Sequence, residues 1–235
     1  MKEQLQKDFD NTIRNLTLSQ KDIEIKKFYL DNFINKGFPN RKEEDWKFSD
    51  LNQIIKKNIG ELSFYSDYTS TNKVDTSAFV DGLEHNKIVF INGRIEKIDF
   101  DYEKKDQIEI IDQSETINKF NNNSSLSDLN SAFTNKSFKI VVKEGYQLTK
   151  PLIIYHTTNS KIWSKNINLR LNFELYENSS LRLIDLFKDT SEKNFLNIFY
   201  NFDLKENSVL KNYKVDKLEN KNIKYSFNNI EQDKN

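Results

Sequence analysis

The sequence has no cysteine, and only five glycines, two prolines and two histidines among its 235 residues. Without cysteine, the chain can form no disulfide and no cysteine-ligated zinc or iron–sulfur site of its own. The few glycines match no glycine-rich phosphate-binding loop. No stretch approaches the ~18 apolar residues of a membrane-spanning helix. The first residues resemble neither a secretory signal nor a transit peptide, so we expect a cytoplasmic protein without a membrane partner.

The charges of the chain are balanced. Lysine and arginine together number 36, as do aspartate and glutamate, so the formal net charge is zero. Sequence-independent nucleic-acid binding needs a basic surplus, and we therefore expect no nucleic-acid partner. Aromatic residues make up 13% of the chain, which is enough apolar bulk for a packed core. Asparagine is frequent, and we interpret this as compositional drift of little functional weight.

Residues 1–60 are predicted to form an N-terminal helical region. Apolar residues recur at helical spacing through the first sixteen positions. A second helix is predicted to begin after Ser19, which with Asp22 resembles a capping box. Gly37 is placed where a helix ends in left-handed backbone, and Pro39 follows it. A short third helix completes the region.

The remaining sequence favours β-structure. Residues 61–130 are predicted to be a linker that contains a β-hairpin, because Asn92-Gly93 separates two apolar runs. Residues 118–128, which are polar, are predicted to be a loop within this linker. Residues 131–235 alternate apolar and polar side chains with a period of two, which is typical of strands.

An internal repeat lies in this strand-rich half. Three segments, 143–148, 176–181 and 205–210, share the pattern x-Glu-[Gly/Asn]-x-x-Leu, and each lies between two predicted strands. Glycine and asparagine tolerate left-handed backbone at a corner. Strand–corner–strand units of this period are typical of a stacked β-solenoid. A β-sandwich of hairpins is the rival, but two-residue hairpin turns are scarce here, so the sequence favours the solenoid.

Few residues are candidates for chemistry. Glu43, Glu44 and Asp45 could bind a metal or act as an acid/base pair, but three adjacent acids cannot face one cavity from a helix. We interpret them as an acidic first helical turn. His85 and His156 have no second histidine or cysteine at ligand spacing, and we interpret both as structural. The residues alone therefore predict no catalytic and no metal-binding site.

The segment from Gly37 to Leu51 resembles the N-terminal motif of the SufD family, which belongs to the SUF system of iron–sulfur cluster assembly. In that family, a string of the form Pro-x-Arg-x-x-Glu-x-Trp-[Lys/Arg]-[Tyr/Phe]-[Thr/Ser] follows the second helix. Here it is carried by Pro39, Arg41, Glu44, Trp46, Lys47, Phe48 and Ser49.

Further segments resemble the same family in the same order. Phe90-Ile-Asn-Gly-Arg94 is similar to the family's hairpin, Leu129-Asn-Ser-Ala-Phe133 to its Leu-Asn-x-Ala-Phe, and Gly145 to Pro151 to the entry of its β-helix. The motif residues in these segments are Asn92, Gly93, Arg94, Leu129, Asn130 and Pro151.

The resemblance implies an α+β fold, with an N-terminal helical region followed by a right-handed parallel β-helix. Residues 131–235 would form the first part of this β-helix. It also implies a non-catalytic scaffold subunit that acts with SufB-like and SufC-like subunits, and indirectly with a cysteine desulfurase. An iron–sulfur cluster would then be present transiently in the complex, and none would be bound by this chain alone.

The chain departs from the family in length. SufD proteins are longer, and their functional histidine and SufC-binding region lie in the later part of the chain. Neither His85 nor His156 matches that histidine. We therefore expect a β-helix that is truncated at the C-terminus and frays or self-associates there. The alternatives are a generic β-solenoid binding module and a β-helix protein that acts on polysaccharide.

Overall fold

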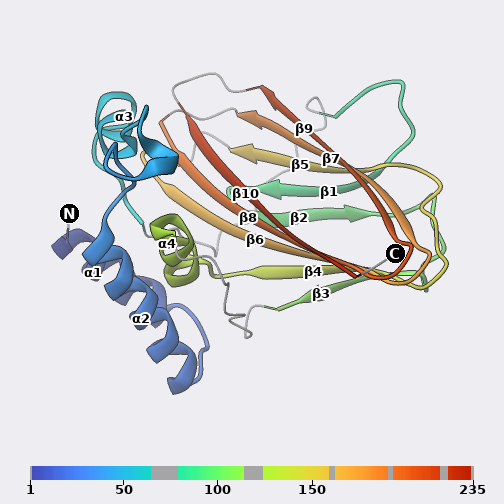
Figure 1. Cartoon of the computed structure of the whole chain (residues 1–235), viewed down its shortest axis with the longest axis horizontal. Helices are drawn as coiled ribbons and strands as arrows, with labels where there is room; N and C mark the ends of the chain where they lie inside the picture. The colour runs from blue at the N-terminus through green and yellow to red at the C-terminus, as the bar shows by residue number, and fades with distance from the viewer. Residues whose placement is uncertain are drawn as a thin grey trace.

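The computed structural model describes residues 2–64, 79–113, 124–158, 162–189, 193–217 and 222–233. Within these ranges, most of the helical structure lies in the first 60 residues, and one further helix follows later in the sequence (Figure 1). The helices are α1 (Lys2–Arg14), α2 (Gln20–Lys36), the 3-10 helix η1 (Glu44–Trp46), α3 (Leu51–Asn58) and α4 (Ser125–Phe133). The predicted N-terminal helices are confirmed.

The ends of α2 follow from local side chains. The hydroxyl of Ser19 accepts a hydrogen bond from the backbone N–H of Asp22 at 3.2 Å, which satisfies a donor that the helix itself cannot pair. At the other end, Gly37 has a φ of 73°, and its N–H donates to the carbonyl of Phe33 at 2.7 Å. Both boundaries agree with the sequence prediction.

In the described ranges, ten strands form two five-stranded sheets. In chain order they are β1 (Asn86–Ile91), β2 (Arg94–Asp99), β3 (Ile108–Asp112), β4 (Ser137–Val142), β5 (Leu152–Thr158), β6 (Asn166–Leu175), β7 (Ser180–Asp189), β8 (Phe195–Leu204), β9 (Val209–Lys217) and β10 (Ile223–Gln232). We call the sheet ordered β2-β1-β5-β7-β9 the outer sheet and the sheet ordered β10-β8-β6-β4-β3 the middle sheet.

The predicted hairpin is confirmed. Strands β1 and β2 pair in antiparallel, and the turn between them places Asn92 and Gly93 at φ angles of 53° and 80°. A side chain at Gly93 would also lie 2.8 Å from the Cγ2 atom of Ile167 in β6. The turn therefore needs glycine both for its backbone and for its packing.

The predicted right-handed parallel β-helix is wrong. Each sheet is mixed, because β2 pairs with β1 and β3 pairs with β4 in antiparallel, while the other pairs are parallel. The two sheets pack face to face as a sandwich, with helices on one of them (Figure 1).

The error has a local cause. The repeated pattern does mark corners, where Gly145, Asn178 and Asn207 have φ angles of 69°, 57° and 58°. At each corner the chain crosses from the middle sheet to the outer sheet, so a sandwich forms without two-residue hairpins at these corners. The same corner chemistry serves either architecture.

Two apolar layers hold the fold together. The first lies between the sheets and is built from alternating side chains of both, such as Leu152, Leu183 and Ile198. The second lies between the middle sheet and α1, α2, α3 and α4, where Phe195 and Phe199 of β8 meet Phe33 and Phe133 of the helices. The molecule therefore has three layers: helices, middle sheet and outer sheet.

The predicted loop at residues 118–128 is wrong in part. Helix α4 begins at Ser125, after the hydroxyl of Ser124 accepts from the N–H of Ser127 at 3.2 Å. Every residue of α4 is buried, including its polar ones. Leu126, Leu129 and Phe133 recur at helical spacing, but the polar residues between them favoured a loop in the sequence. Residues 118–123 lie outside the described residues.

Candidate functional site

A cluster of ionisable side chains lies between the two sheets. The Nε2 atom of His156 (β5) is 2.9 Å from Oδ1 of Asp185 (β7) and 3.0 Å from the hydroxyl of Tyr200 (β8). The Nζ atom of Lys224 (β10) lies 3.5 Å from Oδ2 of Asp185 and 2.6 Å from Oδ1 of Asp216 (β9). We call these five residues the interior cluster, and it joins five strands of both sheets.

The alternation of the strands directs these groups inward. His156 shares the inward side of β5 with Leu152 and Ile154, and Asp185 follows Leu183 on the same side of β7. In the sequence, the sign of this cluster was a polar residue at a strand position where the alternation predicts an inward-facing apolar residue. We noted His156 but missed Asp185 and Lys224, because nothing in the sequence says which strands are neighbours.

Burial and charge control the ionisation of the cluster. Burial by itself would raise the pKa of Asp185, but the charges of His156 and Lys224, with hydrogen bonds from His156 and Tyr200, hold that pKa well below its usual range. Burial, and then the charge of Asp185, raise the pKa of Tyr200 well above its usual value. The carboxylate therefore stays ionised and the phenol stays protonated at neutral pH.

This chemistry suits a structural network better than a catalytic site. The side chains of His156, Asp185 and Lys224 are 4%, 1% and 2% exposed, and Tyr200 is fully buried. A carboxylate with a lowered pKa is a poor base, and a phenol with a raised pKa is a poor nucleophile. The interior cluster connects the two sheets through hydrogen bonds and ion pairs near strands β9 and β10.

A second lysine, Lys214, also connects strands β9 and β10 beside the interior cluster. Lys214 of β9 donates hydrogen bonds to Ser226 and to Asn228 of β10, the latter at 3.0 Å. Its Nζ atom lies 4.6 Å from the ring centroid of Tyr200, within cation–π range. Burial lowers the pKa of this amine. Lys214 and Lys224 together therefore connect the last strand of one sheet to the last strand of the other.

Strands β9 and β10 each form one edge of their sheet among the described residues, and β2 and β3 form the opposite edges. Strand β9 pairs only with β7, and β10 pairs only with β8, within the ranges given above. Large apolar side chains are exposed on both edges: Val209, Tyr213 and Val215 on β9, and Ile230 on β10, each 49–57% exposed. Unpaired edges with apolar side chains are templates for pairing with another chain. We call these two strands the open edge.

The residues that resemble SufD motifs lie in four separate segments of the structure. Pro39, Arg41, Glu44, Trp46, Lys47 and Ser49 lie between α2 and α3; Asn92, Gly93 and Arg94 lie at the β1–β2 hairpin; Leu129 and Asn130 lie in α4; and Pro151 precedes β5. The side-chain amide of Asn130 donates to the carbonyls of Leu169 (3.2 Å) and Asn197 (2.8 Å), which fastens α4 to the middle sheet. Asn130 therefore joins two elements, whereas the ion pairs Lys47–Glu44 and Arg94–Glu96 are local.

Trp46 links the first motif to the open edge. Its ring is half-buried and lies 6.1 Å from the ring of Tyr225 in β10. We expect Trp46→Ala to lower the free energy of unfolding by about 2 kcal/mol, less than the 3–5 kcal/mol of a fully buried tryptophan. Urea denaturation measures this difference, and Phe48→Ala is the control, because Phe48 is 86% exposed and two residues away. Equal stability of the two variants would contradict a packing role for Trp46.

The other candidates have structural partners. Glu43 accepts from the backbone N–H of Asn40 at 3.1 Å, and Glu44 forms an exposed ion pair with Lys47 at 3.0 Å. His85 lies 2.8 Å from the hydroxyl of Tyr155. Within the described ranges, no three histidine, cysteine or acidic residues are grouped so that they could hold a metal ion.

No protein-family model matches the chain, and no curated protein matches it. In the part of the chain that the structure describes, no helix is both long and apolar enough to cross a membrane.

Proposed function

We propose that this protein is a non-catalytic scaffold subunit of a SUF-type iron–sulfur cluster assembly complex, which docks a SufB-like subunit on its open edge. The family part of the proposal rests on the motifs from Pro39 to Pro151. The docking part rests on one observation, the apolar open edge formed by β9 and β10. A SufC-like ATPase and, indirectly, a cysteine desulfurase would complete the complex.

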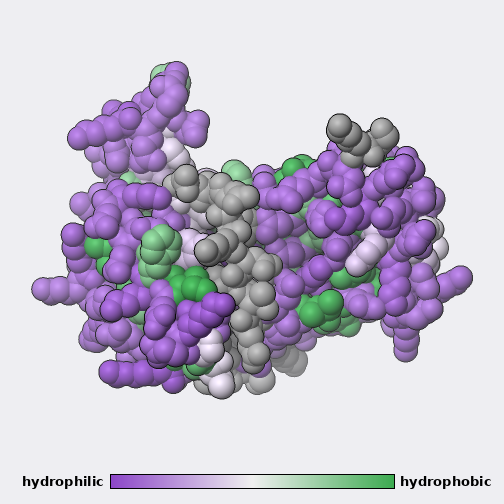
Figure 2. Space-filling view, turned by 60° about the horizontal axis from the view of Figure 1, so that its bottom comes forward, coloured by the Kyte–Doolittle hydropathy of each residue, from purple (hydrophilic) through white to green (hydrophobic). Residues whose placement is uncertain are grey.

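The open edge suits a partner that is itself β-rich. A strand added to β9 or β10 would use the backbone groups that face away from β7 and β8, and main-chain hydrogen bonds would then supply part of the affinity. Tyr213 and Val215 would be buried by such a partner, and tyrosine is enriched among the residues that dominate binding energy. Figure 2 shows that hydrophilic residues dominate the face in view, with several small apolar areas among them.

The lysines that bridge the edge strands support a preformed surface. Lys224 and Lys214 hold β10 against β9 through Asp216 and Asn228, at 2.6 and 3.0 Å. A surface that is already ordered loses less conformational entropy on binding. The interior cluster would thus contribute to docking by keeping the two edges in place.

A double variant of the open edge tests this proposal. We expect Tyr213→Glu with Val215→Glu to weaken binding to a SufB-like subunit by at least about tenfold, because carboxylates would be buried against the partner strand. Titration calorimetry or size-exclusion chromatography measures the complex. Phe28→Glu is the matched control, since Phe28 is 60% exposed on α2, on the helical layer. We expect this control to bind as the unchanged protein does.

The outcomes separate the two parts of the proposal. If the unchanged protein binds neither a SufB-like nor a SufC-like subunit, the SUF assignment is wrong. If it binds but the double edge variant binds equally well, docking uses another surface. Circular dichroism verifies that the variants are folded. We expect them to fold because Tyr213, Val215 and Phe28 are all exposed.

A further inference from the structure

A small groove lies at the corners of the sandwich, where β7 and β9 begin. Its volume is about 330 Å³, which is at the lower end of the range for small-molecule sites. The strand corners lie at the end of the sheets away from the helices (Figure 1). The residues that line the groove are Gln147, Leu148, Asn178, Ser179, Ser180, Leu181, Arg182, Asn207, Val209 and Lys211.

The charged side chains that line the groove are all positive. Arg182 and Lys211 line it, whereas none of its ten described lining residues is an aspartate or glutamate. Glu177 and Glu206 belong to the same corners but are not among the lining residues. No ion pair within the described ranges joins Arg182 or Lys211 to an acid. Two positive charges in one small groove match an anion with two negative charges.

The strand register brings the two cations together. Arg182 in β7 and Lys211 in β9 are partners in a parallel ladder, so their backbones are about 4.8 Å apart and their side chains leave the same face. Like charges in such paired positions repel each other. Arg182 also donates from Nη2 to the carbonyl of Thr149 at 2.9 Å, which orients the guanidinium and leaves it further N–H donors.

A buried hydroxyl supplies an independent observation. Ser179 lines the groove and is only 1% exposed, yet its Oγ atom makes no hydrogen bond to any described residue. A buried hydroxyl without a partner costs free energy, and such groups are uncommon in folded proteins. An oxygen of a ligand in the groove would satisfy it.

We propose that this corner groove binds the phosphate dianion, either free or as the terminal group of a small phosphate monoester. The fork of Arg182 and the ammonium of Lys211 neutralise the two charges, and the guanidinium donates in the planar geometry that phosphate oxygens accept. Asn178, Ser179 and Asn207 also line the groove, and their side chains carry further hydrogen-bond donors.

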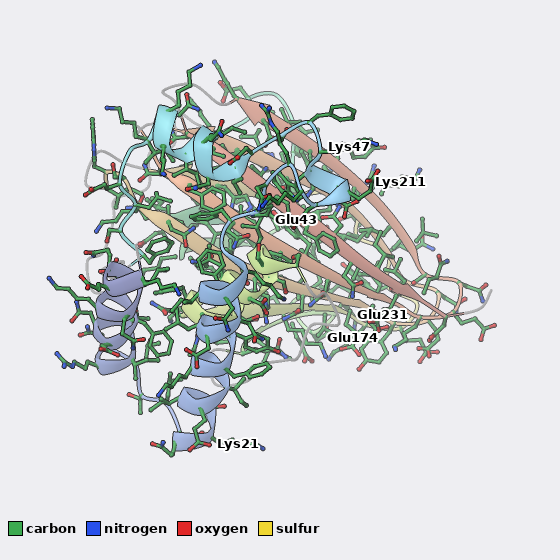
Figure 3. The ribbon with its side chains drawn as sticks, turned by 60° about the vertical axis from the view of Figure 1, so that its left-hand side comes forward. Lys21, Glu43, Lys47, Glu174, Lys211 and Glu231 are labelled. Atoms are coloured by element: carbon green, nitrogen blue, oxygen red, sulfur yellow. The ribbon has the colours of Figure 1, made fainter. Side chains whose placement is uncertain are left out.

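Titration of ¹⁵N-labelled protein with inorganic phosphate tests the proposal. We expect shifts of the backbone amides of Asn178, Ser180 and Asn207, and a dissociation constant that rises at least tenfold in Arg182→Gln with Lys211→Gln. Lys21→Gln is the matched control: Lys21 is an exposed lysine on α2, well apart from Lys211 in Figure 3. A parallel titration with glycerol phosphate distinguishes a monoester, which would bind more tightly than free phosphate if the groove holds more than the anion.

Two further variants guard against indirect effects. Arg182→Lys keeps the charge but loses the planar fork, so it should weaken binding less than Arg182→Gln does. Ser179→Ala should weaken binding several-fold without lowering the melting temperature, because its hydroxyl has no partner in the described structure. The proposal is overturned if phosphate shifts no amide of the groove. It is also overturned if the double variant binds like the unchanged protein, or if Lys21→Gln loses as much affinity as the double variant.

Discussion

Asp185→Asn is expected to lower the free energy of unfolding by about 3 kcal/mol or more at neutral pH, the largest effect of any single change considered. The substitution keeps the shape of the side chain but leaves Lys224 and His156 without the carboxylate that lies 3.5 and 2.9 Å from them. Removing one partner from a buried charge pair is costly, because the other charge remains buried. Urea denaturation of the two proteins measures the difference.

The effect should depend on pH in a defined direction. The pKa of Asp185 is lower in the folded protein than in the unfolded chain, because the charge of His156 and then that of Lys224 outweigh the effect of burial. The ionised carboxylate therefore stabilises the fold above the unfolded pKa of about 4, and this contribution is lost as the pH falls through the range below it. Between about pH 5 and pH 2 the unchanged protein should lose more stability than Asp185→Asn does.

A surface ion pair provides the control. Asp203 lies 2.8 Å from Lys205, but its side chain is 42% exposed. Asp203→Asn should cost less than about 1 kcal/mol, as exposed pairs usually do. Similar losses for Asp185→Asn and Asp203→Asn would mean that the interior cluster is open to water.

The second large effect concerns Lys26, a fully buried lysine of α2. Its Nζ atom donates to the carbonyl of Thr134 at 2.6 Å and to those of Ser131 and Ala132 at 3.4 Å, at the C-terminal end of α4. Burial, and then the charge of Arg170, lower the pKa of Lys26 from 10.5 to about 7. The amine therefore loses its proton near neutral pH in the folded protein and near pH 10.5 in the unfolded chain.

The sign of the pH dependence follows from these two values. Between pH 7 and 10.5 the unfolded chain binds one more proton at this site than the folded protein, so the free energy of unfolding rises with pH. The limiting slope is about 1.4 kcal/mol per pH unit. We expect the stability of the unchanged protein, relative to Lys26→Met, to increase by about 2 kcal/mol from about pH 7.5 to 9.5.

The comparison between variants isolates this one group. Lys21→Met changes an exposed lysine of the same helix, and its stability relative to the unchanged protein should stay constant over that range. Chemical denaturation at several pH values gives all three curves. A constant difference for Lys26→Met would show that Lys26 keeps an ordinary pKa in the folded protein.

Asparagine shows how composition can hide a structural role. The side-chain amide of Asn197 donates to Oδ1 of Asn168 at 3.0 Å, and that of Asn201 donates to Oδ1 of Asn172 at 2.6 Å, each across the β6–β8 ladder. These residues lie on the face of the middle sheet opposite to the core between the sheets. Composition gave no sign of this, because such a ladder exists only after β6 and β8 are aligned.

The features that the sequence determined by itself are local. The cap at Ser19, the end of α2 at Gly37, the hairpin at Asn92-Gly93 and the left-handed corners at Asn178 and Asn207 each follow from a few neighbouring residues. Their physical causes, a capping hydrogen bond or the freedom to adopt positive φ, act within one turn of the chain.

Tertiary structure alone decided the order of the strands and the partners of the buried charges. His156 meets Asp185 and Tyr200, which follow it by 29 and 44 residues, and Lys224 reaches Asp185 from 39 residues away. A strand that alternates apolar and polar residues can bury its apolar face against many neighbours at similar free energy, so its pattern does not identify them. Strand β2 is antiparallel because of its local hairpin, whereas the antiparallel pairing of β3 with β4 was decided by packing of this kind. These two pairings make both sheets mixed and separate the sandwich from the predicted β-helix.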